Sequence, residues 1–205
     1  DSVKRYISET SLHFNGLINI FSQYDIFEFV PIEMFLWIAL MEACHKEHTI
    51  IPFLMTHKNF NNDLLKREGY SGMNCIKFAC MSDTADSLST LMDLDIFTEN
   101  DLKQPGPFGY TAIMWAAAFS QHVTDYIITN KLVSKDDFWK GINGNSIDPL
   151  MIACELGSNS SAVILKSDYM EEKYYNKAYH KNYTPDMVIL GKNLDSRYDI
   201  PKDVY

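Results

Sequence analysis

The chain has 205 residues and a mass of 23.6 kDa, long enough for one large domain or two small ones that bury about 70% of their unfolded surface. Hydrophobic residues make up 46% and charged residues 22%, a balance that excludes an intrinsically disordered chain. Its 27 acidic residues outnumber the 18 Lys and Arg, and the net charge of -9 excludes a surface built to neutralise the phosphates of nucleic acid.

The apolar runs and the cysteines indicate in which compartment the protein is expected. The longest apolar run, from Phe29 to Met41, is shorter than the roughly 18 residues of a membrane helix and is broken by Pro31 and Glu33. We therefore expect a soluble, cytoplasmic protein with no membrane partner. All four cysteines lie in apolar stretches, which favours free buried thiols over disulfides. They are Cys44, Cys75, Cys80 and Cys154.

Residues 1–30 are expected to form an N-terminal helical or capping segment. The run from Leu17 to Phe29 is helical by its apolar pattern, and it follows the hexapeptide Thr-Ser-Leu-His-Phe-Asn at 10–15. Two interpretations of the hexapeptide stay open. It is either a shortened capping repeat or an accidental match to the repeat motif that follows.

Four later stretches share one template of apolar and small residues. They span 74–80, 111–117, 148–154 and, more weakly, 184–190, and a partial copy at 35–40 precedes them. Their anchor residues, spaced 37, 37 and 36 apart, are Ala79, Ala116, Ala153 and Ile189. A fixed spacing of this length is typical of repeat proteins in which one supersecondary unit stacks on the next.

Each copy begins like a helix. Thr111 and Asp148 offer side-chain oxygens that cap free backbone amides, and Pro149 is tolerated in a first helical turn. The small residues that follow, Ala116 among them, let a neighbouring helix approach closely. Second apolar stretches at 88–92, 126–128 and 162–165 predict a helix, a tight turn and a second helix in every unit. The polar breaks between the two are at Asp83, Ser120 and Gly157.

A second motif keeps the same period in the connections between units, which we call fingers. Thr98 and Ser134 are each followed three residues later by a carboxylate, a pattern related to the capping box. We expect a short helical turn in each finger. The side chains expected to pack these turns against the stack are Leu102, Phe138 and Tyr174, each 36 residues apart.

The first motif resembles that of the ankyrin repeat, Gly-x-Thr-Pro-Leu-His-x-Ala-Ala, most clearly at 109–117 and 149–154. The resemblance covers about residues 60–191. It implies an all-α, ankyrin-like helical solenoid with about four to five repeats and lengthened, partly helical fingers. The repeat domain is expected at 31–191, followed at 192–205 by a C-terminal tail or the start of further sequence.

Two departures from the ankyrin pattern predict an altered loop geometry. The period is three or four residues longer than the 33 usual in the family. The motif histidine, which in the family links the backbone of neighbouring turns, is replaced at four positions. These are Lys77, Met114, Met151 and Met187.

The resemblance also implies a groove lined by the residues just before the Thr-Pro step and just after the Ala-Ala pair. Mapped onto this sequence, the partner-binding residues are Tyr70, Met73, Met81, Phe108, Tyr110, Phe119, Glu155 and Leu156. Aromatic residues and methionine are favoured at adaptable binding surfaces. The alternative is that the fingers fold over this face and bury it.

No pattern of catalytic residues is present: the chain lacks a Gly-x-Ser-x-Gly nucleophile motif, a catalytic-cysteine signature and a phosphate-binding loop. The acidic pairs at 136–137 and 171–172 lie at helix starts, where the helix dipole stabilises them as caps. Cys44, His45 and His48 form the densest group of metal-ligand types, but no fourth ligand follows at a usual spacing. We expect no enzyme activity, no cofactor and no bound metal.

These observations favour a protein-protein interaction module that binds an unidentified protein partner through its groove, as a monomer or weak oligomer. One alternative is the regulatory or targeting arm of a larger effector enzyme, favoured by a first residue that is Asp1 rather than Met and by the unfinished last repeat. Another is a metal-binding helical domain based on the group around Cys44. Lys outnumbers Arg 15 to 3, a bias typical of AT-rich genomes, which favours a large DNA virus or an intracellular bacterium whose protein acts in the host cytoplasm.

Overall fold

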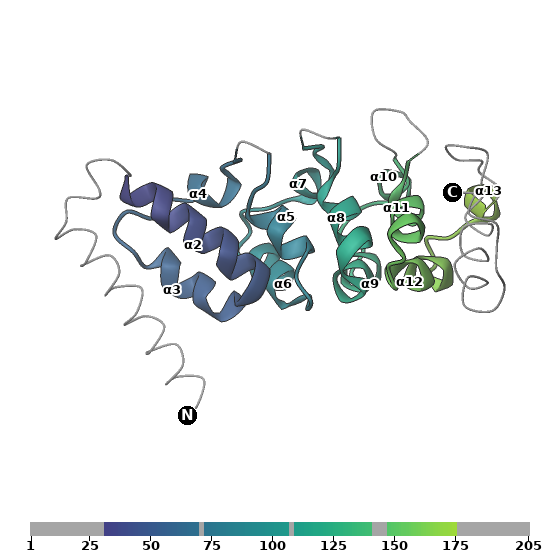
Figure 1. Cartoon of the computed structure of the whole chain (residues 1–205), viewed down its shortest axis with the longest axis horizontal. Coiled ribbons are helices and arrows are strands. Elements are labelled where there is room, and N and C mark those ends of the chain that lie inside the picture. The colour runs from purple at the N-terminus through teal and green to yellow at the C-terminus, as the bar shows by residue number, and fades with distance from the viewer. Residues whose placement is uncertain (1–30, 70–71, 107–108, 141–146, 176–205) are drawn as a thin grey trace, which may run out of the picture.

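The computed structural model describes residues 31–69, 72–106, 109–140 and 147–175, and every regular element in these ranges is a helix (Figure 1). The all-helical prediction is confirmed for this part of the chain. The segments at 1–30, 184–190 and 192–205, for which the sequence made predictions, lie outside the described residues.

The described residues contain the following helices in chain order. In the first half they are α2 (Ile32–Lys46), the short 3-10 helix η2 (His48–Ile50), α3 (Ile51–Met55), α4 (Asp63–Lys66), α5 (Cys75–Cys80), α6 (Asp86–Asp93) and α7 (Glu99–Lys103). In the second half they are α8 (Ala112–Phe119), α9 (Gln121–Thr129), α10 (Lys135–Phe138), α11 (Pro149–Leu156), α12 (Ser160–Lys166) and α13 (Glu172–Tyr175).

The longer helices are arranged as a line of pairs (Figure 1). Within a pair, α5 packs on α6, α8 on α9 and α11 on α12. The first helices of the pairs also form a continuous row, in which α2 packs on α5, α5 on α8 and α8 on α11. Each pair therefore contacts chiefly its neighbours along the line, as expected of stacked units.

The helix starts repeat with the period of the sequence motif. α5, α8 and α11 begin at Cys75, Ala112 and Pro149, which are 37 residues apart in both steps. The short finger helices α7, α10 and α13 begin at 99, 135 and 172, in steps of 36 and 37. The predicted sequence of helix, tight turn, helix and finger helix is confirmed for the units that begin with α5 and α8.

Equivalent side chains cap the first helix of each pair. The side-chain oxygens of Asn74, Thr111 and Asp148 accept the backbone N–H three residues later at 3.2, 3.3 and 3.1 Å. Each bond satisfies one of the amides that a helix start leaves without a partner. The caps predicted at Thr111 and Asp148 are confirmed.

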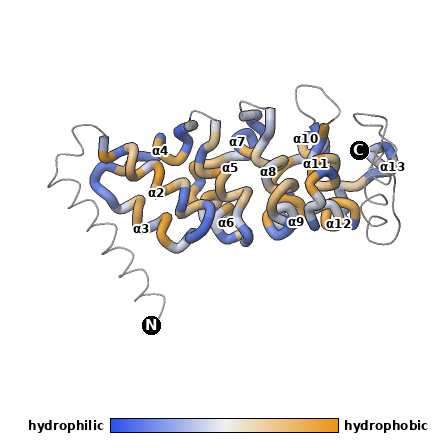
Figure 2. The backbone as a smooth tube through the Cα atoms, viewed as in Figure 1, coloured by the Kyte–Doolittle hydropathy of each residue, from blue (hydrophilic) through white to orange (hydrophobic). Residues whose placement is uncertain are grey.

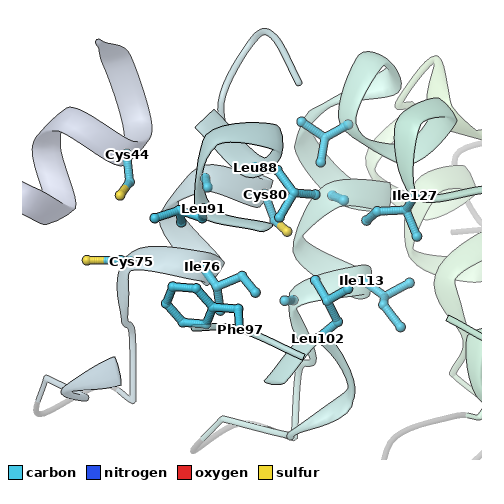
Figure 3. Packing of buried hydrophobic residues seen from close by; sticks show 14 of the residues in the cluster. Cys44, Cys75, Ile76, Cys80, Leu88, Leu91, Phe97, Leu102, Ile113 and Ile127 are labelled. Carbon is cyan, nitrogen blue, oxygen red and sulfur yellow. The ribbon is translucent and has the colours of Figure 1, made fainter. Parts of the chain in front are cut away.

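The core lies between the stacked helices. Ala79, Ala116 and Ala153 have no exposed surface and belong to one buried apolar cluster, so the predicted packing of Ala116 is confirmed. Figure 3 shows Ile76 and Ile113 of successive first helices within this cluster. Hydrophobic residues concentrate on the stacked helices in Figure 2, whereas the turns and fingers are largely hydrophilic.

The fingers contain the expected helical turns. The backbone N–H and the hydroxyl of Thr98 both donate to the Asp101 carboxylate, at 2.7 and 2.9 Å. The hydroxyl of Ser134 accepts the N–H of Asp137 at 3.2 Å. Two of the side chains expected to pack the fingers against the stack, Leu102 and Phe138, are buried. The third, Tyr174, is half-buried and stacks on Trp139 with 4.1 Å between the ring centroids.

The partial motif copy at 35–40 lies within α2, a helix of 15 residues that is longer than the first helices of later units. α2 nevertheless packs on α5 as α5 packs on α8, so it extends the row toward the N-terminus. Within the described ranges, no helix combines the length and apolar character needed to cross a bilayer.

Candidate partner-binding surface

Three aromatic rings form a continuous file along α8. Tyr110 precedes the helix, Trp115 lies in its middle and Phe119 is its last residue. The ring centroid of Trp115 is 5.7 Å from that of Tyr110 and 5.6 Å from that of Phe119, and the Trp115 and Phe119 planes are inclined by 19°. The structure thus connects two predicted residues, Tyr110 and Phe119, through Trp115, which lay outside the predicted set.

Phe119 is open to solvent although its ring is held in place. Its exposed fraction is 53%, and that of Leu156 at the end of α11 is 60%. The two residues are 37 apart, so they occupy equivalent positions in successive units. Ser82, the equivalent residue in the preceding unit, is buried. The described parts of the fingers therefore leave Phe119 and Leu156 uncovered.

The remaining predicted residues are distributed over three units. Met73 and Met81 are half-buried before and after α5, and Glu155 is exposed beside Leu156. Tyr70 and Phe108 lie outside the described residues. Among the described positions, ring stacking connects only those of the α8 unit.

A hollow of about 420 Å³ opens beside Phe119. The turns after α5, α8 and α11 contribute Asp83, Ser120 and Gly157 to its wall. These are the three polar breaks of the sequence, each 37 residues from the next. Their common period is the one signal in the sequence that points to a shared site, although each residue by itself only marks the end of a helix.

His122 was also missed by the sequence analysis. It lines the hollow beside Phe119 and an adjoining one of about 380 Å³, and Asp83 likewise lines both. His122 is the second residue of α9, where no motif marks it as special. Its position between the two hollows becomes visible only in the structure, where the α5–α6 and α8–α9 turns lie close together.

The charge on this surface is negative. The only charged residues in α5, α8 and α11 are Lys77, which is buried, and Glu155, which is exposed. Asp83 adds an exposed carboxylate at the hollow. The described part of the surface therefore combines aromatic and apolar side chains with acidic ones.

Lys77 braces the turn that leads into α5. Its side chain is 1% exposed, and its Nζ donates to the backbone oxygen of Gly72 at 2.6 Å and to Glu68 Oε1 at 3.0 Å. The same Nζ lies beside the next finger, because a Cβ added at Gly106 would be 3.3 Å from it. Lys77 thus reaches the turns of two neighbouring units from the position at which the ankyrin motif has histidine.

These two turns share a backbone hydrogen bond and a glycine conformation. In the first, Gly69 N–H donates to Met73 O at 2.8 Å, and in the second, Gly106 N–H donates to Tyr110 O at 2.9 Å. Gly72 and Gly109 adopt positive φ angles of 66° and 78°, which favour glycine over residues with a Cβ. Lys77 therefore links two turns that share these features, and the expectation of an altered loop geometry stays a prediction.

The group around Cys44 is a packed helix end. Cys44 is fully buried, and its hydrogen bond with the Cys75 thiol, together with burial, raises its pKa well above the ordinary value. Burial also raises the pKa of Cys80, so neither thiol is primed as a nucleophile. The His45 ring lies 6.0 Å from that of Phe78. In the part of the chain that the structure describes, no three Cys, His, Asp or Glu residues gather as metal ligands.

The acidic residues of the fingers connect neighbouring units rather than acting only as helix caps. Lys66 pairs with Asp101 at 3.3 Å, Lys103 with Asp137 at 2.8 Å and Lys135 with Glu171 at 3.0 Å. Each pair joins one finger to the next.

Comparison with known proteins assigns no family or function to the chain, because no protein-family model matches it and no curated protein shows significant similarity to it.

Proposed function

We propose that the chain is a protein-binding module of the ankyrin-repeat type, which holds its partner on a surface formed by Tyr110, Trp115, Phe119 and Leu156. The module has no cofactor and no catalytic activity of its own. The observation that carries the proposal is that the Phe119 ring is stacked on Trp115 and yet is 53% exposed. A ring fixed in this way loses little conformational entropy on binding, and such aromatic side chains supply much of the energy of protein interfaces.

Local geometry supports the ankyrin-like assignment, with about four to five repeats. Successive first helices begin 37 residues apart and carry a side-chain cap at the same position. Gly109 takes a positive φ two residues before the cap Thr111, in agreement with the Gly-x-Thr order of the family motif. Solenoids of this type present extended surfaces for binding and contact only their neighbours internally.

We place the module in the cytoplasm, and in the host cytoplasm if it comes from a virus or an intracellular bacterium. All four cysteines are buried and form no disulfide within the described residues, which agrees with a reducing compartment. A monomer or weak oligomer is favoured because, among the described residues, the large apolar side chains that are exposed are confined to Ile38, Phe119 and Leu156. Obligate dimers bury far larger apolar surfaces.

The proposal is tested by capture from cell lysate with matched bait proteins. Replacing Tyr110 and Phe119 together by Ala should weaken retention of the partner by about 2 kcal/mol or more, which is about 30-fold in affinity. The unfolding midpoint should change little, since Phe119 is exposed and Tyr110 half-buried. Ile38→Ala is the matched control, because it removes an apolar side chain that is 49% exposed on α2. Equal capture by the double variant and the control would refute the proposal.

A further inference from the structure

The hollow beside Phe119 brings together an exposed ring and an acidic group from two different units. The ring is the last residue of α8, and Asp83 lies in the turn between α5 and α6. The rest of the wall consists of small and polar side chains, among them Ser120, Asn159 and the imidazole of His122. No Lys or Arg is present in the wall.

Asp83 differs from the finger carboxylates in that no lysine or arginine among the described residues pairs with it. Asp101, Asp137 and Glu171 each accept a lysine from a neighbouring finger. Asp83 is exposed and forms no ion pair with any residue that the structure describes. Its carboxylate is therefore available to a group from another molecule.

A lysine or arginine side chain has the two properties that such a hollow requires. Its methylene stem packs on an aromatic ring, and its charged end pairs with a carboxylate. The net charge of -9 attracts a basic segment and repels an acidic one. Leu156, in the position of the next unit equivalent to Phe119, is exposed and directly precedes Gly157 of the wall, so it offers an apolar contact next to the hollow.

We propose that this hollow is a socket for a lysine or arginine side chain of a protein partner, with the stem on Phe119, the cation at Asp83 and an adjacent apolar residue of the partner against Leu156. The inference rests on the proposed protein-binding function and adds the chemistry of the partner: a segment in which a basic residue stands next to apolar ones.

A displayed library of random peptides tests this chemistry without knowledge of the natural partner. Selection on the intact chain should enrich peptides with Lys or Arg beside a large apolar residue. A synthetic copy of an enriched peptide should bind Asp83→Asn at least about fivefold more weakly than the unmodified chain. The difference should shrink at high salt, because exposed charge pairs are screened.

Asp86→Asn is the matched control, because Asp86 is also exposed, lies three residues away in α6, and is absent from the wall of the hollow. It should leave the affinity within about twofold of the unmodified chain. Enrichment of neutral or acidic peptides, or equal effects of the two Asn variants, would overturn the socket. Phe119→Ala separates the two proposals: if neutral peptides bind and this variant abolishes their binding, the surface functions without the socket. If the library yields no binder at all, both proposals fail.

Discussion

Lys77 is a charged residue in the apolar row of first helices, and the turns around it explain its presence. Its ammonium group donates to Gly72 O and Glu68, and it lies against Gly106 of the next finger. A buried lysine is stabilised only where hydrogen bonds replace those it loses with water. The equivalent residues Met114 and Met151 have no such donor, so the bridge formed by Lys77 does not recur in the next two units.

Replacing Lys77 by Met, the residue of the next two units, should destabilise the chain by about 1–3 kcal/mol. The reason is that the backbone oxygen of Gly72 loses its charged donor in a buried place. Amide hydrogen exchange should accelerate in the turns around Gly72 and Gly109 before it does so in α11. Lys66→Met, which removes an exposed lysine, should cost less than about 1 kcal/mol. If both variants lose the same free energy of unfolding in urea, the hydrogen bonds of Lys77 contribute no more to stability than an exposed lysine.

At the scale of elements, the fingers hold the stack together along one edge through charge. The chain of pairs runs from Lys66 to Asp101, from Lys103 to Asp137 and from Lys135 to Glu171. Hydrogen bonds from Lys103, Lys140 and Ser134 hold the pKa of Asp137 well below its ordinary range. Lys173 and Lys135 lower the pKa of Glu171 in the same way. Partial burial opposes ionisation of Asp101, but Thr98 and Lys66 lower its pKa overall.

These shifts predict a loss of stability in acid. A carboxylate whose pKa is depressed by folding contributes its full stabilisation above its unfolded pKa of about 4, and the contribution disappears as the pH falls through the lower folded value. The free energy of unfolding should therefore decrease below about pH 4. Asp137→Asn should lower it by about 0.5–1 kcal/mol at neutral pH and flatten the acid dependence. Asp136→Asn, at the neighbouring exposed residue, should do neither.

The contact between first helices depends on small side chains. Ala116 is fully buried between α8 and its neighbours, so a larger side chain has no room there. Ala116→Leu should lower stability by about 1–3 kcal/mol through overpacking. Ala118→Leu is the matched control on the same helix, since Ala118 is only half-buried and lines the hollow. An unchanged melting temperature for Ala116→Leu would mean that α8 and its neighbours are not in close contact.

At the scale of the whole molecule, the local rules of the stack could be predicted from the sequence. The caps at Thr111 and Asp148, the finger helices and the burial of Leu102 and Phe138 all follow from short-range patterns repeated at a fixed period. Short-range patterns of this kind depend on residues a few positions apart, which is why a single sequence reveals them.

Features that depend on residues about 35 apart could not be predicted in the same way. The hollow requires the turns that carry Asp83, Ser120 and Gly157 to meet, and the period of these residues alone does not tell which side chains remain exposed. The finger ion pairs likewise join lysines to carboxylates of the next unit. The bridge formed by Lys77 requires that the turn at Gly72 and the turn at Gly106 both lie next to its ammonium group.

The proposed function places a protein partner on the Phe119 face. Site-specific photo-cross-linking tests it most directly, with a photoreactive phenylalanine analogue placed at Phe119 in the intact chain and, for comparison, at the exposed Lys131 after α9. In cell lysate, the analogue at Phe119 should form one dominant protein adduct, which Asp83→Asn weakens and which the analogue at Lys131 does not form. An adduct of equal yield from Lys131, or none from Phe119, would show that the partner does not bind at Phe119.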